Sequence, residues 1–188
     1  KKFKLGCINL PYCLSDNRRV LMPHRFDRRV KIISPTSLFH SARALAKARF
    51  RNRHPVYGGS GCPVIVEGRR DMETLRSLGF EGPIELVNRG WGQGRLIAHL
   101  HDSYGRQNPV DGGPALMLMM DWDRTGIRLH ENLLVRMRSL DMRIDVSTRK
   151  TLMRTVALKA PTIEGLKNLV DDLLPLINLE DPPPDVVF

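Results

Sequence analysis

Two short apolar runs that end in carboxylates constrain the fold of this chain more than any other feature of its sequence. Residues 64–66 lead into Glu67, and residues 115–120 lead into Asp121 and Asp123. Short, continuous apolar runs indicate strands that are buried on both faces of a parallel sheet. The carboxyl ends of such strands meet at the edge of the sheet where α/β proteins bind ligands. The two runs therefore predict an acidic site at that edge.

The sequence around these runs alternates between strand-like and helix-like patterns. We expect strands at 64–67, 84–87, 115–120 and 142–146, and helices at 69–78, 95–102, 127–140, 148–157 and 163–177. This alternation predicts an α/β fold, with a Rossmann-like parallel sheet flanked by helices and right-handed crossovers. We expect the α/β domain to span residues 61–180, and residues 181–188 to form a proline-rich tail.

Basic charge is concentrated in the first third of the chain. Residues 1–60 carry 14 Lys and Arg but only 2 Asp, whereas the remaining residues carry 16 Lys and Arg against 18 Asp and Glu. The net charge of +10 therefore comes from this third, which predicts a polyanionic partner for it. We interpret residues 1–60 as a basic N-terminal extension with one helix, at about 37–52, and a flexible joint at the glycine-rich residues 58–61.

Candidate nucleic-acid contacts occur in both parts of this extension. Its first part interleaves arginines with Tyr12, His24 and Phe26, which suits phosphate contact combined with base stacking; the alternative is a solvated arm. The basic residues of the expected helix line one face; the alternative is an ordinary amphipathic helix with a solvated face. The candidates are Arg18, Arg19, Arg25, Arg28, Arg29, Lys31, Arg43, Lys47, Arg51 and Arg53.

The two acidic strand ends predict a metal site. Alternate residues of an extended segment point the same way, so Asp121 and Asp123 can face one side together, and Glu67 joins them if its strand is adjacent. Two bare carboxylates about 4 Å apart repel by roughly 4 kcal/mol at an effective dielectric of about 20. Mg²⁺ or Mn²⁺ relieves this repulsion because each prefers oxygen ligands.

A fourth carboxylate, Asp71, joins Glu67, Asp121 and Asp123 as an expected metal ligand. Each position also has an alternative interpretation. Asp121 could cap the helix at 127–140, although it is somewhat early, and Asp123 is closer to that role. Asp71 falls in the first turn of the helix at 69–78, where a negative charge is favourable by itself. Glu67 could be a surface glutamate that follows a strand.

Four arginines lie near the acidic positions or in the glycine-rich loop at residues 88–94. They are Arg69, Arg70, Arg89 and Arg124. They are candidates to bind phosphates beside the metal; the alternative is that they pair with the carboxylates. The loop lacks the Gly-Lys-Ser/Thr ending of a P-loop. Its glycines offer amides to an anion, and a plain connector with Trp91 packed on the domain is the alternative.

The spacing of the acidic motifs resembles the Toprim domain, which topoisomerases, bacterial-type primases, certain nucleases and the bacterial maturase of 5S ribosomal RNA share. The residues that match its pattern are Glu67, Gly68, Asp71, Asp121, Asp123 and Gly126. The resemblance covers roughly residues 63–146 and implies a Toprim-like fold. It also implies that Glu67 acts as a general acid or base, as the matching glutamate is thought to do in nucleases and topoisomerases.

Among these proteins, a small stand-alone Toprim protein with a basic arm is most similar to the 5S ribosomal RNA maturase group. The chain is too short for the tyrosine-bearing cleavage domain of a topoisomerase or for a complete primase. It departs from the maturase group at Arg69, a position that is often lysine there, and at Trp122, which stands inside the Asp-x-Asp motif.

The predicted metal site and the basic extension lead to two functional hypotheses. In the first, the protein is a Mg²⁺-dependent nuclease that matures structured RNA, ribosomal RNA above all, with Glu67, Asp121 and Asp123 as catalytic residues. In the second, it is a non-catalytic RNA-binding protein, a stable component of the ribosome or another ribonucleoprotein that its basic arm anchors. Both hypotheses favour RNA over DNA as the partner. Both also allow ribosomal RNA and ribosomal proteins as the partners.

The cysteines and the lengths of the apolar runs indicate the cellular compartment in which we expect the protein to work. Cys7, Cys13 and Cys62 form neither a disulfide framework nor a zinc spacing, which favours a reducing cytoplasm. The longest uncharged apolar run, residues 115–120, is far too short to span a membrane. We therefore expect no membrane partner, and we see no signal peptide, although the chain begins at Lys1.

Overall fold

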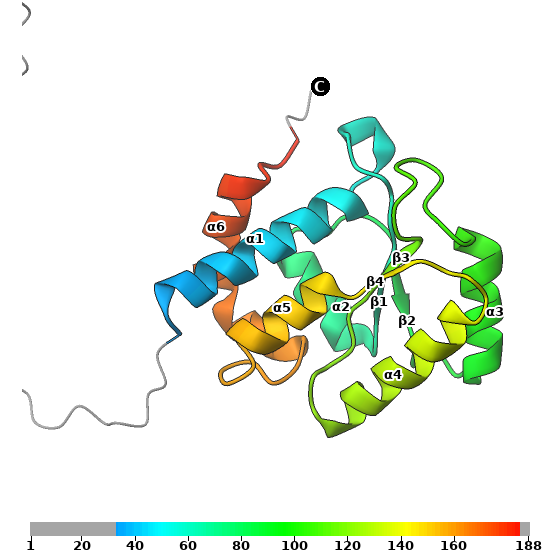
Figure 1. Ribbon diagram of the computed structural model, residues 1–188. Helices are drawn as coiled ribbons and strands as arrows, with labels where there is room; N and C mark the ends of the chain where they lie inside the picture. The colour runs from blue at the N-terminus through cyan, green and yellow to red at the C-terminus, as the bar shows by residue number, and fades with distance from the viewer. Residues whose placement is uncertain (1–32, 185–188) are drawn as a thin grey trace, which may run out of the picture. The chain divides into compact units, whose positions relative to one another are not determined.

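Four short parallel strands form the centre of the fold. The computed structural model describes residues 33–184 of the 188-residue chain (Figure 1). The strands are β1 (Val64–Val66), β2 (Ile84–Leu86), β3 (Leu116–Leu118) and β4 (Ile144–Asp145). They pair in the order β2-β1-β3-β4, and every pair is parallel. The predicted α/β fold with a parallel sheet flanked by helices is thereby confirmed.

Helices follow the strands as the alternating pattern predicts. They are α1 (Pro35–Asn52), α2 (Arg69–Ser77), α3 (Gln93–Tyr104), α4 (Arg124–Arg138), α5 (Ser147–Thr155) and α6 (Val170–Glu180), with 3-10 helices η1 (Pro55–Tyr57) and η2 (Glu164–Leu169). Among the described residues, no helix is both long enough and apolar enough to cross a membrane.

The helix expected at 163–177 differs most from the structure. It is divided into η2 and α6, and α6 continues beyond Pro175 to Glu180. Proline lacks the N–H of a regular helical hydrogen bond, so the sequence alone favours an earlier end. The helix continues because Leu173 and Ile177, on either side of Pro175, are both fully buried in the core.

The sheet is covered on both faces, and its short strands divide their side chains between two cores. Val64 and Val66 belong to one core with residues of α1, α2, α5 and α6, whereas Ile65 belongs to the other with residues of α3 and α4. Alternate residues of a strand point to opposite faces, so the central strands β1 and β3 each contribute to both cores. Figure 1 shows α3 and α4 on one side of the sheet and the other four helices on the opposite side.

The expected extension helix is part of this fold. It is α1, which begins behind the N-cap Ser34, whose hydroxyl accepts a hydrogen bond from the Ser37 N–H at 3.1 Å. Its inner face buries Ala42 and Leu45 against α5 and α6. We expected a flexible joint at residues 58–61, but a Cβ on Gly59 would lie 2.1 Å from the Arg53 carbonyl oxygen. The chain is packed closely there, so α1 belongs to the α/β unit.

A buried ion-pair cluster fastens α1 to the end of α6. The carboxylate of Asp181 lies 2.8 Å from Arg49 Nε and 2.8 Å from Arg53 Nη2. All three side chains are at most 10% exposed. Two expectations are corrected here. Arg53 is buried in this cluster and so cannot reach a nucleic acid, and Asp181 lies in the core although we placed the start of the tail at this residue.

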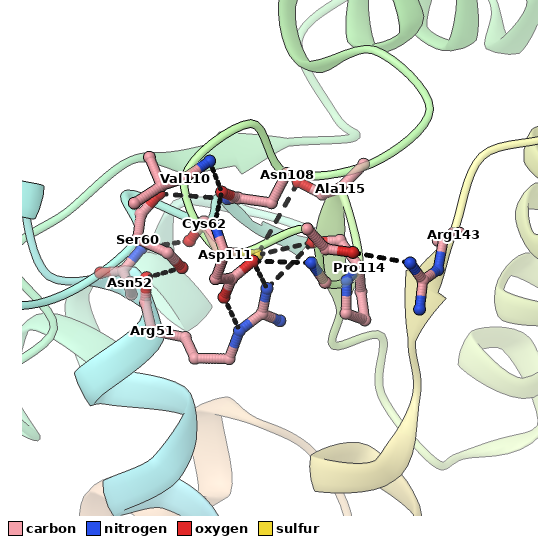
Figure 2. Close-up of polar contacts among 12 residues, drawn as sticks. Arg51, Asn52, Ser60, Cys62, Asn108, Val110, Asp111, Pro114, Ala115 and Arg143 are labelled. Carbon is pink, nitrogen blue, oxygen red and sulfur yellow. Dashed lines mark hydrogen bonds and ion pairs between the residues drawn. The ribbon is translucent and has the colours of Figure 1, made fainter.

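Cys62 lies beneath the C-terminal end of α1, against the loop that precedes β3 (Figure 2). Its thiol is 3.6 Å from the Pro114 carbonyl oxygen. The side chain is fully buried, and burial raises the pKa of the thiol to about 12. Cys62 is thus a protonated core residue at neutral pH.

Replacing Asp181 with alanine should destabilise the protein strongly. The change leaves the guanidinium groups of Arg49 and Arg53 buried without a counter-charge, which typically costs about 3–5 kcal/mol. Chemical denaturation measures the loss in the free energy of unfolding. The neighbouring substitution Glu180→Ala is the control, because Glu180 forms only a long, partly exposed contact with Arg43 at 3.8 Å and should change stability by about 0.5 kcal/mol or less. Equal losses in the two variants would contradict the structural role of Asp181.

Candidate functional site

The acidic site lies at the carboxyl edge of the sheet, between β1 and β3. The chain runs from β1 to β2 on one side and then returns to place β3 on the other. Such a reversal of strand order opens a crevice at the strand ends, where open α/β sheets bind ligands. Glu67 follows β1, and its Oε1 atom accepts a hydrogen bond from the Asp121 N–H at 3.1 Å. The structure therefore brings together the two acidic strand ends that the sequence predicts to be neighbours.

Asp121 and Asp123 are each held by a backbone amide. Asp121 Oδ1 accepts from the Ile163 N–H at 2.7 Å, ahead of η2. Asp123 is the N-cap of α4, and its Oδ1 accepts from the Gly126 N–H at 2.7 Å. The capping alternative for Asp123 is thus what the structure shows. A Cβ on Gly126 would lie 2.4 Å from the Asp121 carbonyl oxygen, so glycine is required for α4 to begin this close to Asp121.

Asp71 completes the acidic group from the first turn of α2. Its Oδ2 atom accepts the Gly68 N–H at 2.9 Å, which closes the turn after β1. The side chain is buried. Glu67, Asp71, Asp121 and Asp123 therefore each use one carboxylate oxygen to accept a backbone N–H. Among them, Glu67, Asp121 and Asp123 retain a second oxygen that makes no hydrogen bond within the described residues.

The pKa values of three of these carboxylates are raised, chiefly by burial and, for Asp121 and Glu67, also by mutual repulsion. Burial, together with the negative charges of Asp71, Glu67 and Asp123, raises the pKa of Asp121 to about 6, against the bond from the Ile163 N–H. Burial and the nearby Asp71 and Asp123 likewise raise the pKa of Glu67. Burial also raises the pKa of Asp71. The group thus holds more negative charge than its surroundings stabilise.

A buried arginine that sequence reasoning missed supports this edge. Arg149, in the first turns of α5, donates from Nε to the Met120 carbonyl oxygen at 2.8 Å and from Nη2 to that of Asp121 at 2.7 Å. Burial lowers its pKa, whereas the charges of Asp121 and Glu67 act in the opposite direction. The only signal in the sequence is its place soon after the strand expected at 142–146. Arg149 fixes the backbone that carries Asp121 and supplies a positive charge behind it.

The donor set suits a hard divalent cation, although the described residues form no preformed cage. Within residues 33–184, no three Asp, Glu, His or Cys side chains converge as ligands of one metal ion. Mg²⁺ is usually bound through only one or two carboxylates and keeps several waters. The free oxygens of Glu67, Asp121 and Asp123 are of the type it prefers. A cation there would offset the repulsion that raises the pKa values of Glu67 and Asp121.

The arginines near the site that we predicted to bind phosphates differ in their exposure and in whether they are paired within the protein. Arg69 and Arg124 are exposed, and Arg70 is exposed with a long contact to Glu164 at 3.6 Å. Arg89 is engaged by Glu85 and by the Leu86 carbonyl oxygen. The guanidinium carbon of Arg89 also lies 5.0 Å from the centre of the Trp91 ring, and that of Arg95 lies 4.5 Å from it. Trp91 therefore packs against α3 through Arg95 and His99, as the connector alternative with Trp91 packed on the domain predicts.

The basic residues of α1 are partly exposed and partly paired within the protein. Arg43 and Lys47 are exposed on α1. Arg51 binds Asp111 at 3.0 Å and the Pro114 carbonyl oxygen at 3.1 Å, which ties α1 to the loop before β3 (Figure 2). The remaining candidates, Arg18, Arg19, Arg25, Arg28, Arg29 and Lys31, lie outside the described residues.

Comparison with known proteins identifies the family. A UPF0292 protein of Thermococcus onnurineus is 35% identical over 119 residues, which make up 63% of this chain and 79% of that relative. The chain belongs to the UPF0292 family. UPF0292 relatives from Pyrococcus furiosus and Methanosarcina barkeri are 30% and 27% identical, over 58% and 62% of this chain and 75% of each relative. No protein-family model and no solved structure matches this UPF0292 chain.

Replacing Asp121 with asparagine should stabilise the metal-free protein at high pH. The pKa of about 6 lies above the usual 3.8, so the folded state binds this proton more tightly and loses stability as the pH rises through that window. Asparagine removes the charge and keeps an oxygen for the Ile163 N–H. We expect a gain of about 1–2 kcal/mol at pH 8, discounted for partial exposure, that disappears toward pH 4.

Chemical denaturation in EDTA at several pH values measures this difference. Asp102→Asn is the control, because the Asp102 side chain on α3 is 82% exposed. A gain that does not depend on pH, or one that the Asp102 variant shares, would show that Asp121 is not strained by its neighbours.

Proposed function

We propose that this protein is a Toprim-type RNA-processing enzyme that cleaves phosphodiester bonds in structured RNA with Mg²⁺ or Mn²⁺. The observation that carries the proposal is the meeting of Glu67 and Asp121 at the strand-order reversal of the sheet, joined by the Asp121 N–H to Glu67 bond. Backbone amides hold these carboxylates in place before any ligand arrives. Preorganised acidic groups at this edge suit a reaction that depends on charge and position.

The side chains at this edge divide the work between them. The free oxygens of Glu67, Asp121 and Asp123 would hold the cation, which when bound polarises a phosphate oxygen and promotes loss of a proton from water. Burial raises the pKa of Glu67, which suits a group that exchanges a proton during catalysis. The exposed Arg69 and Arg124 stand beside the acidic group, where they would bind the phosphates on either side of the cleaved bond.

The charge distribution supports a nucleic acid as the substrate. The acidic edge carries a local excess of negative charge, whereas residues 1–32 carry 9 Lys and Arg against 2 Asp. A polyanion that reaches the acidic edge must be attracted elsewhere on the protein, and this segment supplies that attraction. RNA is favoured over DNA by the resemblance to the ribosomal RNA maturase group.

A second candidate function is supported by the hydrogen bonds of the carboxylates. All four of them accept a hydrogen bond from a backbone N–H, so each has a structural role that needs no metal. A protein that uses these residues only to shape the sheet edge would bind RNA as a stable part of a ribonucleoprotein, without cleaving it. The two candidates differ in what the charge of Asp121 is needed for.

The nuclease proposal predicts metal-dependent cleavage that Asp121→Asn abolishes. Purified protein should cut a structured ribosomal RNA with Mg²⁺ or Mn²⁺ but not with EDTA, and Asp121→Asn should lower the rate by about 100-fold or more, as loss of a transition-state charge contact does. Binding of the RNA should be unchanged. Asp102→Asn should retain full activity. Tight RNA binding without any turnover in the wild type would favour the second candidate.

Both candidates predict that residues 1–32 contribute phosphate contacts. Each such contact steepens the dependence of log affinity on log salt concentration by about 0.7–0.9. A protein that starts at residue 33 should therefore show a shallower salt dependence than the full chain, by several of these increments. The cut belongs at residue 33, because removing residues 1–60 also removes the core helix α1. An unchanged slope, measured by fluorescence anisotropy with labelled RNA, would exclude this segment from the interface.

A further inference from the structure

A groove between α1 and α5 lies apart from the acidic edge. Its volume is about 670 Å³. Side chains from both helices line it, including Arg43 and Lys47 of α1 and Ser147, Thr151 and Arg154 of α5. Figure 1 shows α5 running alongside α1, and the two helices are packed together. The groove is thus built on two helices of the rigid core.

The groove carries a net positive charge. Arg43, Lys47 and Arg154 are all exposed along it. Among the described residues that line the groove, the one carboxylate is that of Asp145. It accepts hydrogen bonds from the Ser147 N–H and hydroxyl, each at 2.7 Å. Arg43 and Lys47 are four residues apart, which is about 6 Å along a helix. Arg43 and Lys47 on the α1 wall thus stand opposite Arg154 on the α5 wall. This arrangement of positive charges suits an extended anion.

Hydroxyl groups on α5 add acceptors between these cations. Thr151 Oγ1 donates to the Ser147 carbonyl oxygen at 3.0 Å, and Thr155 Oγ1 donates to that of Thr151 at 2.8 Å. Because its proton is used in this way, the Thr151 oxygen faces the groove as an acceptor, whereas the Thr155 oxygen already lies 2.6 Å from the Ser41 hydroxyl. A group that carries both negative charge and hydroxyl donors would satisfy both walls. The sugar–phosphate backbone of RNA is such a group, because its 2′-hydroxyl can donate.

We propose that the α1–α5 groove binds the sugar–phosphate backbone of RNA. Arg43, Lys47 and Arg154 contact phosphates, and Thr151 accepts from a 2′-hydroxyl. Residues 1–32 are excluded as the occupant because their own charge is strongly positive. The inference rests on the proposed RNA binding and deepens it, since it assigns a second RNA contact to the folded domain.

The groove is linked to the acidic edge through α5. Arg149 on one side of this helix holds the Met120 and Asp121 carbonyl oxygens, whereas Thr151 and Arg154 line the groove on another. The same rigid helix thus positions both sites. An RNA held in the groove is held at a fixed position relative to Asp121.

Lysine footprinting on the full chain tests the groove directly. A labelled structured RNA should protect Lys47 from acetylation by an amine-reactive ester, whereas Lys150, exposed on α5 outside the groove, should be protected much less. Mass spectrometry measures both in the same molecule. Equal modification of Lys47 with and without bound RNA would overturn the inference.

Charge-reversal variants provide the second arm. Lys47→Glu with Arg154→Glu should weaken RNA binding by roughly tenfold or more, as loss of two phosphate contacts does. Lys150→Glu with Arg136→Glu changes the net charge equally at exposed positions outside the groove and should cost about threefold or less. Thr151→Val removes the proposed acceptor for a 2′-hydroxyl. It should therefore lower the ratio of the affinity for RNA to the affinity for DNA of the same sequence. Thermal denaturation confirms that each variant is folded.

The outcomes separate this inference from the proposed function. Equal losses in the two double variants, or RNA binding that survives the groove reversal, would overturn the groove assignment and leave RNA binding intact. Tighter binding of polyglutamate than of RNA, lost on groove reversal, would assign the groove to an acidic protein instead. A wild-type chain that binds no structured RNA would overturn both.

Discussion

The parallel pairing of β1 with β3 determines most of what this molecule can do. It brings two chain segments, some fifty residues apart in sequence, to one edge and so forces carboxylates together. The fold tolerates this because backbone N–H groups and the buried Arg149 stabilise the acidic residues from behind. The negative charge that these groups do not neutralise contributes, together with burial, to the raised pKa of Asp121. A cation would supply the missing positive charge. Repulsion between the carboxylates therefore both lowers the stability of the metal-free protein and favours the binding of a cation.

The position of α1 links the basic and acidic parts of the protein. Its buried face contributes to the core on one side of the sheet, and the Asp181 cluster fastens its C-terminal half to α6. Its exposed face carries Arg43 and Lys47. The helix is therefore a structural element and a basic surface at once. Together with α5 it makes the positive surface as rigid as the acidic edge.

Much of the fold follows from local patterns in the sequence. The runs before Glu67 and Asp121 identify the two central strands, because buried parallel strands are continuously apolar. The edge where the acids meet follows from that assignment. Spacing in the chain also identifies the N-cap at Asp123. These features depend on residues close in sequence, and such interactions are what a pattern records.

The features that sequence reasoning missed depend on contacts between distant residues. Nothing near Arg53 indicates that Asp181 will neutralise it, and a basic residue after a basic helix is naturally assigned to the surface. Arg149 is one of many arginines until β3 and α5 are packed together. The assignment of α1 to the extension failed for the same reason, since its apolar face has no partner until α5 and α6 are in place.

The burial of Cys62 has a practical consequence. A protonated thiol enclosed by the core reacts slowly with alkylating agents, so Cys62 should resist a maleimide while the native fold is intact. Modification of Cys62 therefore reports on opening of the core between α1 and the loop before β3.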